Sequence, residues 1–215
     1  MMLSKAALLI AGNKVPTEPG KAFGGGYYAG KIQIAGVQYA LVIAPLEAET
    51  SARGASNTVS TAFYTVNDGA ANNLRMVTDG SPAAIYCANY RGSGFADWYL
   101  PSRDELELCY RNLKPSTEQN TLSLSQNPGG HGANTNSVPA GAAYTANLPL
   151  RTAVALFQST GAQRFNSVSD SIYWTSTPYN NDYVLYQSFQ NGAQNIYTPY
   201  NTTCRVRPMR KVRIS

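Results

Sequence analysis

Alternating apolar and polar residues between positions 28 and 45 predict a β-hairpin. Ile32 and Ile34 share one face of the first strand, and every second residue from Val37 to Ile43 is apolar or aromatic. A period of two is typical of a strand with one buried face. The two-residue Ala35-Gly36 connection is typical of a tight hairpin turn. We therefore expect a small N-terminal β-hairpin unit.

Three short helices are predicted by the residues that precede them. Asp68 is a residue type that caps a helix by accepting hydrogen bonds from its first backbone N–H groups. Ser81 and Pro82 combine a capping side chain with a proline at the first helical position. Ser102, followed three residues later by Glu105, is a capping box and predicts the third helix.

The third helix begins with acidic residues that are either catalytic or structural. Asp104 and Glu105 fall in its first turn, where negative charge complements the helix dipole by about 0.3–1 kcal/mol. Glu107 is expected to point away from the apolar face. We therefore interpret these acids as structural. The apolar face of this helix comprises Leu106, Cys109, Tyr110 and Leu113.

A polar, turn-rich segment follows from residue 114 to 147. Loops of this length usually either bind something or pack as an ordered excursion of the surface. The only histidine of the chain, His131, lies in this segment between two glycines and is expected to be an exposed surface residue. Residues 150–159 are then expected to form a helix with Leu156 and Phe157 turned inward.

The pattern changes to short strands from residue 172 onward. Strands are expected over residues 172–177, 182–192, 193–198 and 202–212, and Asn191-Gly192 supplies a hairpin turn. Strands joined by turns of this kind form an antiparallel meander. Together with the short helices, this pattern predicts the α+β fold class.

Composition and charge favour a surface that adheres over one that catalyses. Only 13% of the 215 residues are charged, while 15 are tyrosines. The net charge of +5 raises the question of a nucleic-acid partner. However, five of the 17 basic residues lie between positions 205 and 213, and the others are dispersed singly. This distribution gives no phosphate-binding stripe, so we expect no nucleic-acid partner.

The cysteines and the N-terminal residues indicate in which cellular compartment the chain folds. Cys87, Cys109 and Cys204 lack the paired spacing of a metal site, and we expect all three to be reduced and mostly buried. The apolar run in residues 1–16 is expected to be a first helix or strand, because no small-x-small signal cleavage site follows it. No apolar run approaches the roughly 20 residues of a membrane span.

Residue types also exclude several kinds of active site. A Ser-His-Asp or Cys-His arrangement would have to use His131, and the nucleophile-elbow motif is absent. The glycines at 24–26 lack the ending of a phosphate loop. Zinc would need clustered Cys and His, and calcium would need several carboxylates. Asp97, Asp170 and Asp182 could in principle meet as a glycosidase pair, but nothing in their spacing indicates that they do. We expect no enzymatic activity, no metal and no cofactor.

What remains is a group of tyrosines and asparagines in the late strands and their connections. Tyrosine offers a large contact area at low entropic cost, and asparagine supplies adaptable hydrogen bonds, as in antibody binding sites. For a single residue the interpretation without a binding role is an ordinary strand tyrosine or turn asparagine. For the group as a whole we favour binding. The candidate contact residues are Trp174, Tyr179, Asn180, Asn181, Asp182, Tyr183, Tyr186, Asn195, Tyr197, Tyr200 and Asn201.

Several of these motifs together resemble the collagen-like adhesin C-terminal domain family (Lcl C-terminal type), as found in phage and bacterial proteins. The similarity covers roughly residues 60 to 212 and is carried by "DWYLP" before a helix, "YWTST", "FQNG" and a closing "RVR". The segment "GGGYYAGKIQIAGVQYALVIAP" also resembles the one that precedes this domain in phage virion proteins.

The resemblance implies a C-type-lectin-like domain, a twisted antiparallel sheet with short flanking helices, over residues 59–215. Residues 1–58 would be an N-terminal β-rich attachment or oligomerisation segment. The binding face would lie on the late strands, at residues 179–186 and 195–203. The Glu-Pro-Asn or Gln-Pro-Asp signature of calcium-dependent sugar lectins is missing, so calcium-mediated sugar binding is not expected.

Three hypotheses follow from these observations. The first is a non-enzymatic bacteriophage virion surface protein of the tail-fibre, tail-tip or head-fibre type, made in the host cytoplasm, that recognises a glycan or protein of the host surface. It would be a homo-oligomer, with a trimer among the options. The second is a capsid decoration protein whose lectin-like face contacts neighbouring virion subunits. The third is an enzyme related in fold to the formylglycine-generating type, which would require reactive cysteines.

Overall fold

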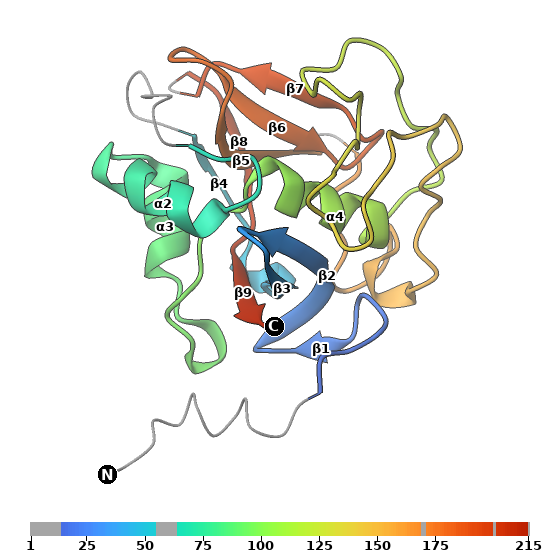
Figure 1. Ribbon diagram of the computed structural model, residues 1–215, viewed down its shortest axis with the longest axis horizontal. Helices are drawn as coiled ribbons and strands as arrows, with labels where there is room; N and C mark the ends of the chain where they lie inside the picture. Colours follow the sequence, from blue (N-terminus) through green and yellow to red (C-terminus); the bar gives the residue numbers. More distant parts are fainter. Residues whose placement is uncertain (1–13, 55–63, 169–170, 200, 215) are drawn as a thin grey trace.

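The computed structural model describes residues 14–54, 64–168, 171–199 and 201–214 (Figure 1). Over these ranges the chain is a mixed α+β fold with two curled antiparallel sheets and few helices, which confirms the expected class. The element expected at residues 1–16 falls almost entirely outside the described residues.

The first sheet joins the N-terminal hairpin to the last strand of the chain. Its strands are β1 (Ala22–Phe23), β2 (Gly26–Ile34), β3 (Val37–Ile43) and β9 (Met209–Arg213), in the order β1-β2-β3-β9. The predicted hairpin is confirmed. Ala35 and Gly36 connect β2 to β3 with φ values of 48° and 81°, and positive φ at both central residues is what a type I′ turn requires.

The second sheet contains most of the late strands. Its strands are β4 (Thr50–Arg53), β5 (Ile172–Pro178), β6 (Val184–Ser188), β7 (Gln194–Tyr197) and β8 (Thr203–Val206), in the order β4-β8-β5-β6-β7. The expected antiparallel meander is present from β5 to β7. β8 instead lies between β4 and β5, and it makes a parallel bridge to β5.

Strands from both ends of the chain therefore share each sheet. β3 pairs with β9, and β4 pairs with β8. The domain boundary that we expect at residues 58–59 lies outside the described residues.

The three predicted helices are confirmed together with their caps. They are α2 (Gly69–Thr78), α3 (Pro82–Asn89) and α4 (Arg103–Leu113). Asp68 accepts from the N–H of Ala71, and Ser81 accepts from the N–H of Ala84. At α4 both halves of the capping box are formed. Short 3₁₀ turns occur at η1 (Leu46–Ala48), η2 (Gly92–Gly94) and η3 (Ala155–Phe157).

The prediction of a helix over residues 150–159 is wrong, because that segment contains only the single 3₁₀ turn η3. The backbone groups that a helix would use are engaged elsewhere. The N–H of Thr152 donates to the carbonyl of Lys114, and the N–H of Val154 donates to the hydroxyl of Thr152. Phe157 is nevertheless buried, as expected.

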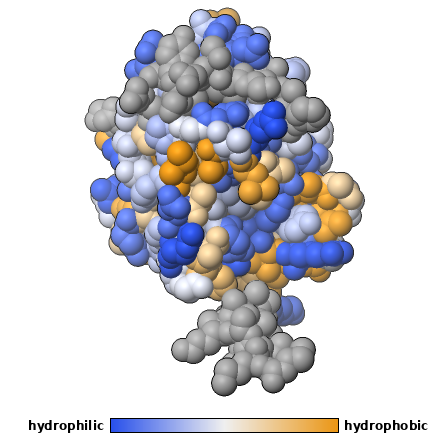
Figure 2. All heavy atoms as spheres, turned by 90° about the vertical axis from the view of Figure 1, so that its left-hand side faces the viewer, coloured by the Kyte–Doolittle hydropathy of each residue, from blue (hydrophilic) through white to orange (hydrophobic). Residues whose placement is uncertain are grey.

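α4 lies between the two sheets and contributes to the largest core cluster (Figure 1). Tyr110 of α4 packs against Phe189 at 5.6 Å and against Tyr144 at 5.3 Å between ring centroids. Phe165 stacks on Phe189 at 3.9 Å. α2 and α3 pack beside the second sheet. Figure 2 faces this helical side and shows apolar side chains interspersed with hydrophilic ones.

The long segment after α4 is an ordered excursion held by hydrogen bonds. Its backbone reaches β2 through Val138 N–H, which donates to Lys31 O. The buried Lys114 donates to Asn120 Oδ1 and to the carbonyl of Pro149. Of the two alternatives that its length indicates, the packed excursion is therefore present, and binding by this segment stays a prediction.

Candidate functional site

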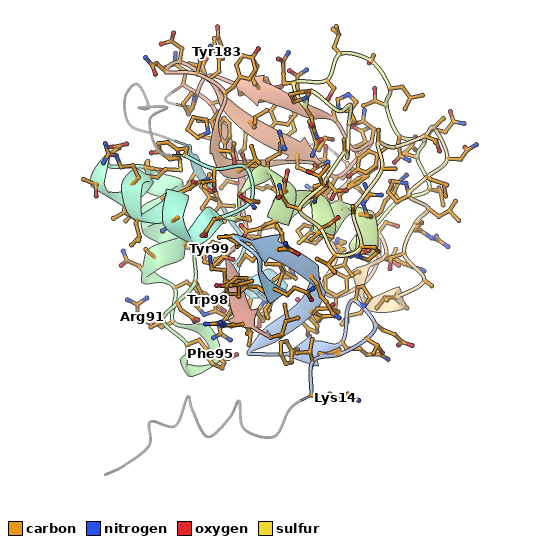
Figure 3. All side chains as sticks on the ribbon, in the orientation of Figure 1. Lys14, Arg91, Phe95, Trp98, Tyr99 and Tyr183 are labelled. Carbon is orange, nitrogen blue, oxygen red and sulfur yellow. The ribbon has the colours of Figure 1, made fainter. Side chains whose placement is uncertain are left out.

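The connection between β5 and β6 forms a fixed loop at one end of the second sheet. Asn180 Oδ1 accepts from the backbone N–H groups of Asp182 and Tyr183, each at 2.9 Å. The N–H of Tyr179 donates to the carbonyl of Tyr183, also at 2.9 Å. Because these hydrogen bonds within the loop fix its backbone, Tyr179 and Tyr183 are held in a defined arrangement. Their exposed fractions are 49% for Tyr179 and 38% for Tyr183. Figure 3 labels Tyr183 at this end of the molecule.

A second group of candidate residues lies on the adjoining strands. Tyr186 of β6 pairs with Asn195 of β7, and Val184 pairs with Tyr197. Directly paired residues lie on the same face of a sheet. The rings of Tyr186 and Tyr197 are 4.7 Å apart, and 38% of Tyr197 is exposed. Burial, followed by the proximity of Tyr197, raises the pKa of Tyr186 to about 12, so its hydroxyl remains a neutral donor at physiological pH.

The described residues on this end of the protein form what we call the tyrosine surface. Asn181, Asp182 and Asn201 are exposed, while Asn195 is half-buried and its side-chain oxygen accepts from Ile196 N–H. Tyr200 lies outside the described residues. The tyrosine surface comprises Tyr179, Asn180, Asn181, Asp182, Tyr183, Tyr186, Asn195, Tyr197 and Asn201.

Trp174 is not part of this surface, which corrects the sequence interpretation. Only 1% of its side chain is exposed, and its indole N–H donates to the carbonyl of Ala52 at 3.0 Å. Its ring lies 6.5 Å from that of Tyr197, edge to face. Trp174 therefore supports the exposed tyrosine from inside and cannot contact a partner itself.

The acids of α4 were the competing candidates for a site, and both glutamates are fully buried. Glu105 Oε2 accepts from the backbone N–H groups of Gly69 and Ser102, and Oε1 accepts from the Tyr99 hydroxyl. Burial raises the pKa of Glu105 to about 7. Its contacts connect the start of α4 to the start of α2, which is a structural role.

Glu107, which is expected to point away from the apolar face, is nevertheless fully buried. Its Oε1 accepts from Arg111 Nε and the Tyr144 hydroxyl, and its Oε2 accepts from Asn134 Nδ2. The long segment covers this side of the helix and supplies Asn134 and Tyr144, so the carboxylate is enclosed. Burial raises the pKa of Glu107 to about 7 as well. Every carboxyl oxygen of both glutamates thus has a protein donor.

Three surface hollows in the described part of the chain do not open onto these glutamates. Their volumes are about 290, 350 and 330 Å³. They lie next to Lys114, next to Phe23 and next to Arg111, and neither glutamate lines any of the three. A substrate in these hollows could not reach the carboxyl groups.

His131 is buried and not exposed, which is a further correction. Its Nδ1 accepts from the backbone N–H of Gln194 at 2.9 Å, so Nε2 carries the proton and donates to the carbonyl of Ser123 at 2.7 Å. The ring joins the long segment to the start of β7. A glycine-flanked histidine gives no sequence signal for this role, because neither partner is a near neighbour in the sequence: Ser123 lies elsewhere in the same segment and Gln194 lies in β7.

The described residues also bear on cofactors and thiols. Among them, no three His, Cys, Asp or Glu side chains gather in a way that could hold a metal ion. All three cysteines are buried and outside any disulfide between described residues, as expected. Burial raises the pKa of the Cys87 and Cys109 thiols, which keeps both protonated and unreactive. No helix in the described part of the chain is long and apolar enough to cross a membrane.

No protein-family model, curated protein or solved structure matches the chain. The similarity to the collagen-like adhesin family therefore stays a prediction based on its motifs. The tyrosine surface has to be judged on its own chemistry.

Proposed function

We propose that this protein is a non-enzymatic bacteriophage virion surface protein whose C-type-lectin-like domain recognises the host surface. The observation that carries the proposal is the tyrosine surface. It presents three exposed aromatic rings and several amides on a loop and strands that are held by hydrogen bonds and ring contacts. A preorganised surface of this kind binds a partner without losing much conformational entropy.

The position of Lys14 relative to Tyr183 supports attachment through the N-terminal segment. Lys14, where the described chain begins, and Tyr183 lie at opposite ends of the molecule in Figure 3. A particle bound through residues before Lys14, or a homo-oligomer built there, would leave the tyrosine surface facing outward. This arrangement suits recognition of a host molecule better than contact with neighbouring capsid subunits.

The buried acids and thiols support the absence of enzymatic activity. Glu105 and Glu107 have their oxygens occupied by donors of the protein itself. The cysteine chemistry that a formylglycine-generating enzyme needs would require a reactive thiol, whereas the three thiols are buried.

Adsorption of particles that carry the double variant Tyr183→Ala/Tyr197→Ala tests the proposal. We expect adsorption to host cells to fall by about tenfold or more, because two exposed aromatic contacts are lost. Incorporation of the protein into particles should not change. The control is Leu150→Ala, which removes an exposed apolar side chain away from the tyrosine surface.

Two other results would contradict the proposal. Loss of incorporation with the double variant would support the capsid decoration function instead. Unchanged adsorption by normally assembled particles would show that the tyrosine surface is not the recognition site.

A further inference from the structure

The segment of the chain that supplies the residues of the tyrosine surface is almost free of charge. From Ile172 to Cys204 the sequence contains a single ionisable acid, Asp182, and no Lys, Arg or His. The whole chain, in contrast, carries 17 basic residues and a net charge of +5. The basic residues are therefore placed elsewhere, and this segment offers no side-chain cation to a ligand.

This absence of cations bears on the ligand class. An anionic polymer that covers the tyrosine surface would lose hydration at its charged groups, and the segment has no Lys or Arg to compensate for that loss. The one charged side chain of this segment, the exposed Asp182, would repel an anion. An uncharged partner loses no hydration at charged groups and is not repelled by Asp182.

The rings are arranged as supported, partly exposed plates. Tyr197 packs on Tyr186 at 4.7 Å, tilted by 33°, and edge to face on Trp174 at 6.5 Å. These contacts hold one side of Tyr197, while 38% of the residue stays exposed. Flat aromatic area of this kind stacks on flat apolar faces of a ligand, such as the C–H face of a sugar ring.

Hydrogen-bonding groups surround these rings at the edge of the sheet. The exposed Asp182 carboxylate accepts hydrogen bonds, and the exposed amide of Asn201 and the hydroxyls of Tyr179 and Tyr183 both donate and accept them. Ligand hydroxyl groups are matched to such a mixture, because each hydroxyl also donates and accepts. Asn180 holds the loop by accepting from Asp182 and Tyr183 backbone N–H groups, so these groups are presented in a fixed arrangement.

We propose that the tyrosine surface binds an uncharged, hydroxyl-rich carbohydrate chain through sugar rings stacked on its tyrosines, without a metal ion. This inference rests on the proposed recognition function and names its ligand class. The alternatives, an anionic polysaccharide and a protein, are outcomes of the test.

The test measures binding of the full chain to immobilised neutral polysaccharides, namely dextran, mannan and galactan, and to the anionic polysaccharides heparin and polygalacturonate. Each is measured at low and high salt and with a chelator present. We expect binding to at least one neutral polysaccharide, with an affinity that changes little with salt, because no charge pairing is screened. The chelator should have no effect.

Two substitutions at one position separate stacking from loss of structure. Tyr197→Phe keeps the ring and should retain binding, whereas Tyr197→Ala should weaken it by about tenfold or more. Leu150→Ala serves as the control, because its side chain is exposed outside the tyrosine surface. A thermal unfolding curve for each variant confirms that it is folded.

Several results would overturn the inference. These are failure to bind every neutral polysaccharide, salt-sensitive binding to the anionic ones alone, and neutral binding that Tyr197→Ala leaves intact. Host cells stripped of protein by protease distinguish the two proposals. If the double variant abolishes adsorption of particles, and protease treatment of the cells does the same, recognition by the tyrosine surface stands but its ligand is a protein.

Discussion

Gly192 lies in the turn that connects β6 to β7, and replacing it tests whether this turn packs against the core as described. Its φ is +75°, a conformation that alanine adopts only with strain. A Cβ atom there would lie 2.8 Å from Cε1 of Tyr110 and 2.9 Å from Cε2 of Tyr144. Both rings are buried in the core, so neither can move away freely.

Gly36 provides the matched control, because it has φ of +81° but no atom within 4 Å of an added Cβ. Gly36→Ala should therefore cost only the backbone strain, about 1 kcal/mol. Gly192→Ala should cost that strain plus overpacking of about 1–3 kcal/mol, or about 2–4 kcal/mol in all.

Urea unfolding followed by tryptophan fluorescence measures both free energies of unfolding, with similar m values expected for the two variants. The difference of about 1–3 kcal/mol corresponds to roughly 2–12 °C in Tm for a chain of this size. Equal losses for the two variants, or a larger loss for Gly36→Ala, would refute the described packing of Tyr110 and Tyr144 against the turn.

Three further predictions follow from the buried groups. The pKa of Glu105 and Glu107 is about 7 in the folded protein against an ordinary value of 4.5, so the folded state binds more protons between these values. The stability that these two glutamates contribute is fully present below about pH 4.5 and is lost as the pH rises through about 7. The Tm should therefore be higher at pH 5 than at pH 8. A Tm that increases from pH 5 to pH 8 would contradict the raised pKa values of the two glutamates. His131→Ala should destabilise the protein by about 1–3 kcal/mol and speed hydrogen exchange at the Gln194 amide, because buried groups lose their partner; unchanged exchange would argue against that hydrogen bond. The three thiols should react with a thiol reagent only after unfolding, and rapid labelling of the native protein would show that at least one is accessible.

Features that depend on a few neighbouring residues were predictable. The Ala35-Gly36 turn and the caps at Asp68, Ser81 and Ser102 each follow from contacts within about four residues. The exposed loop tyrosines Tyr179 and Tyr183 also belong to this group, because turn residues lie at the surface.

Features that depend on distant contacts were not predictable. Trp174 and Tyr186 alternate with their neighbours in the same way, yet the first is buried and the second only half-buried, because Ala52 and β4 lie next to the tryptophan. Glu107 lies on the polar side of α4 by spacing, and it is buried because Asn134 and Tyr144 of the long segment cover it. His131 is buried for the same kind of reason.

The amino-acid sequence by itself determined the hairpin, the capped helices, the β5–β7 meander and the nearly uncharged character of the segment from Ile172 to Cys204. These properties are set by local backbone preference and by composition. Only the tertiary structure decided that β8 lies between β4 and β5, that the glutamates are enclosed, and which tyrosines remain exposed. The reason is physical: burial depends on what the rest of the chain places against a side chain, and no periodicity within one strand or helix encodes it.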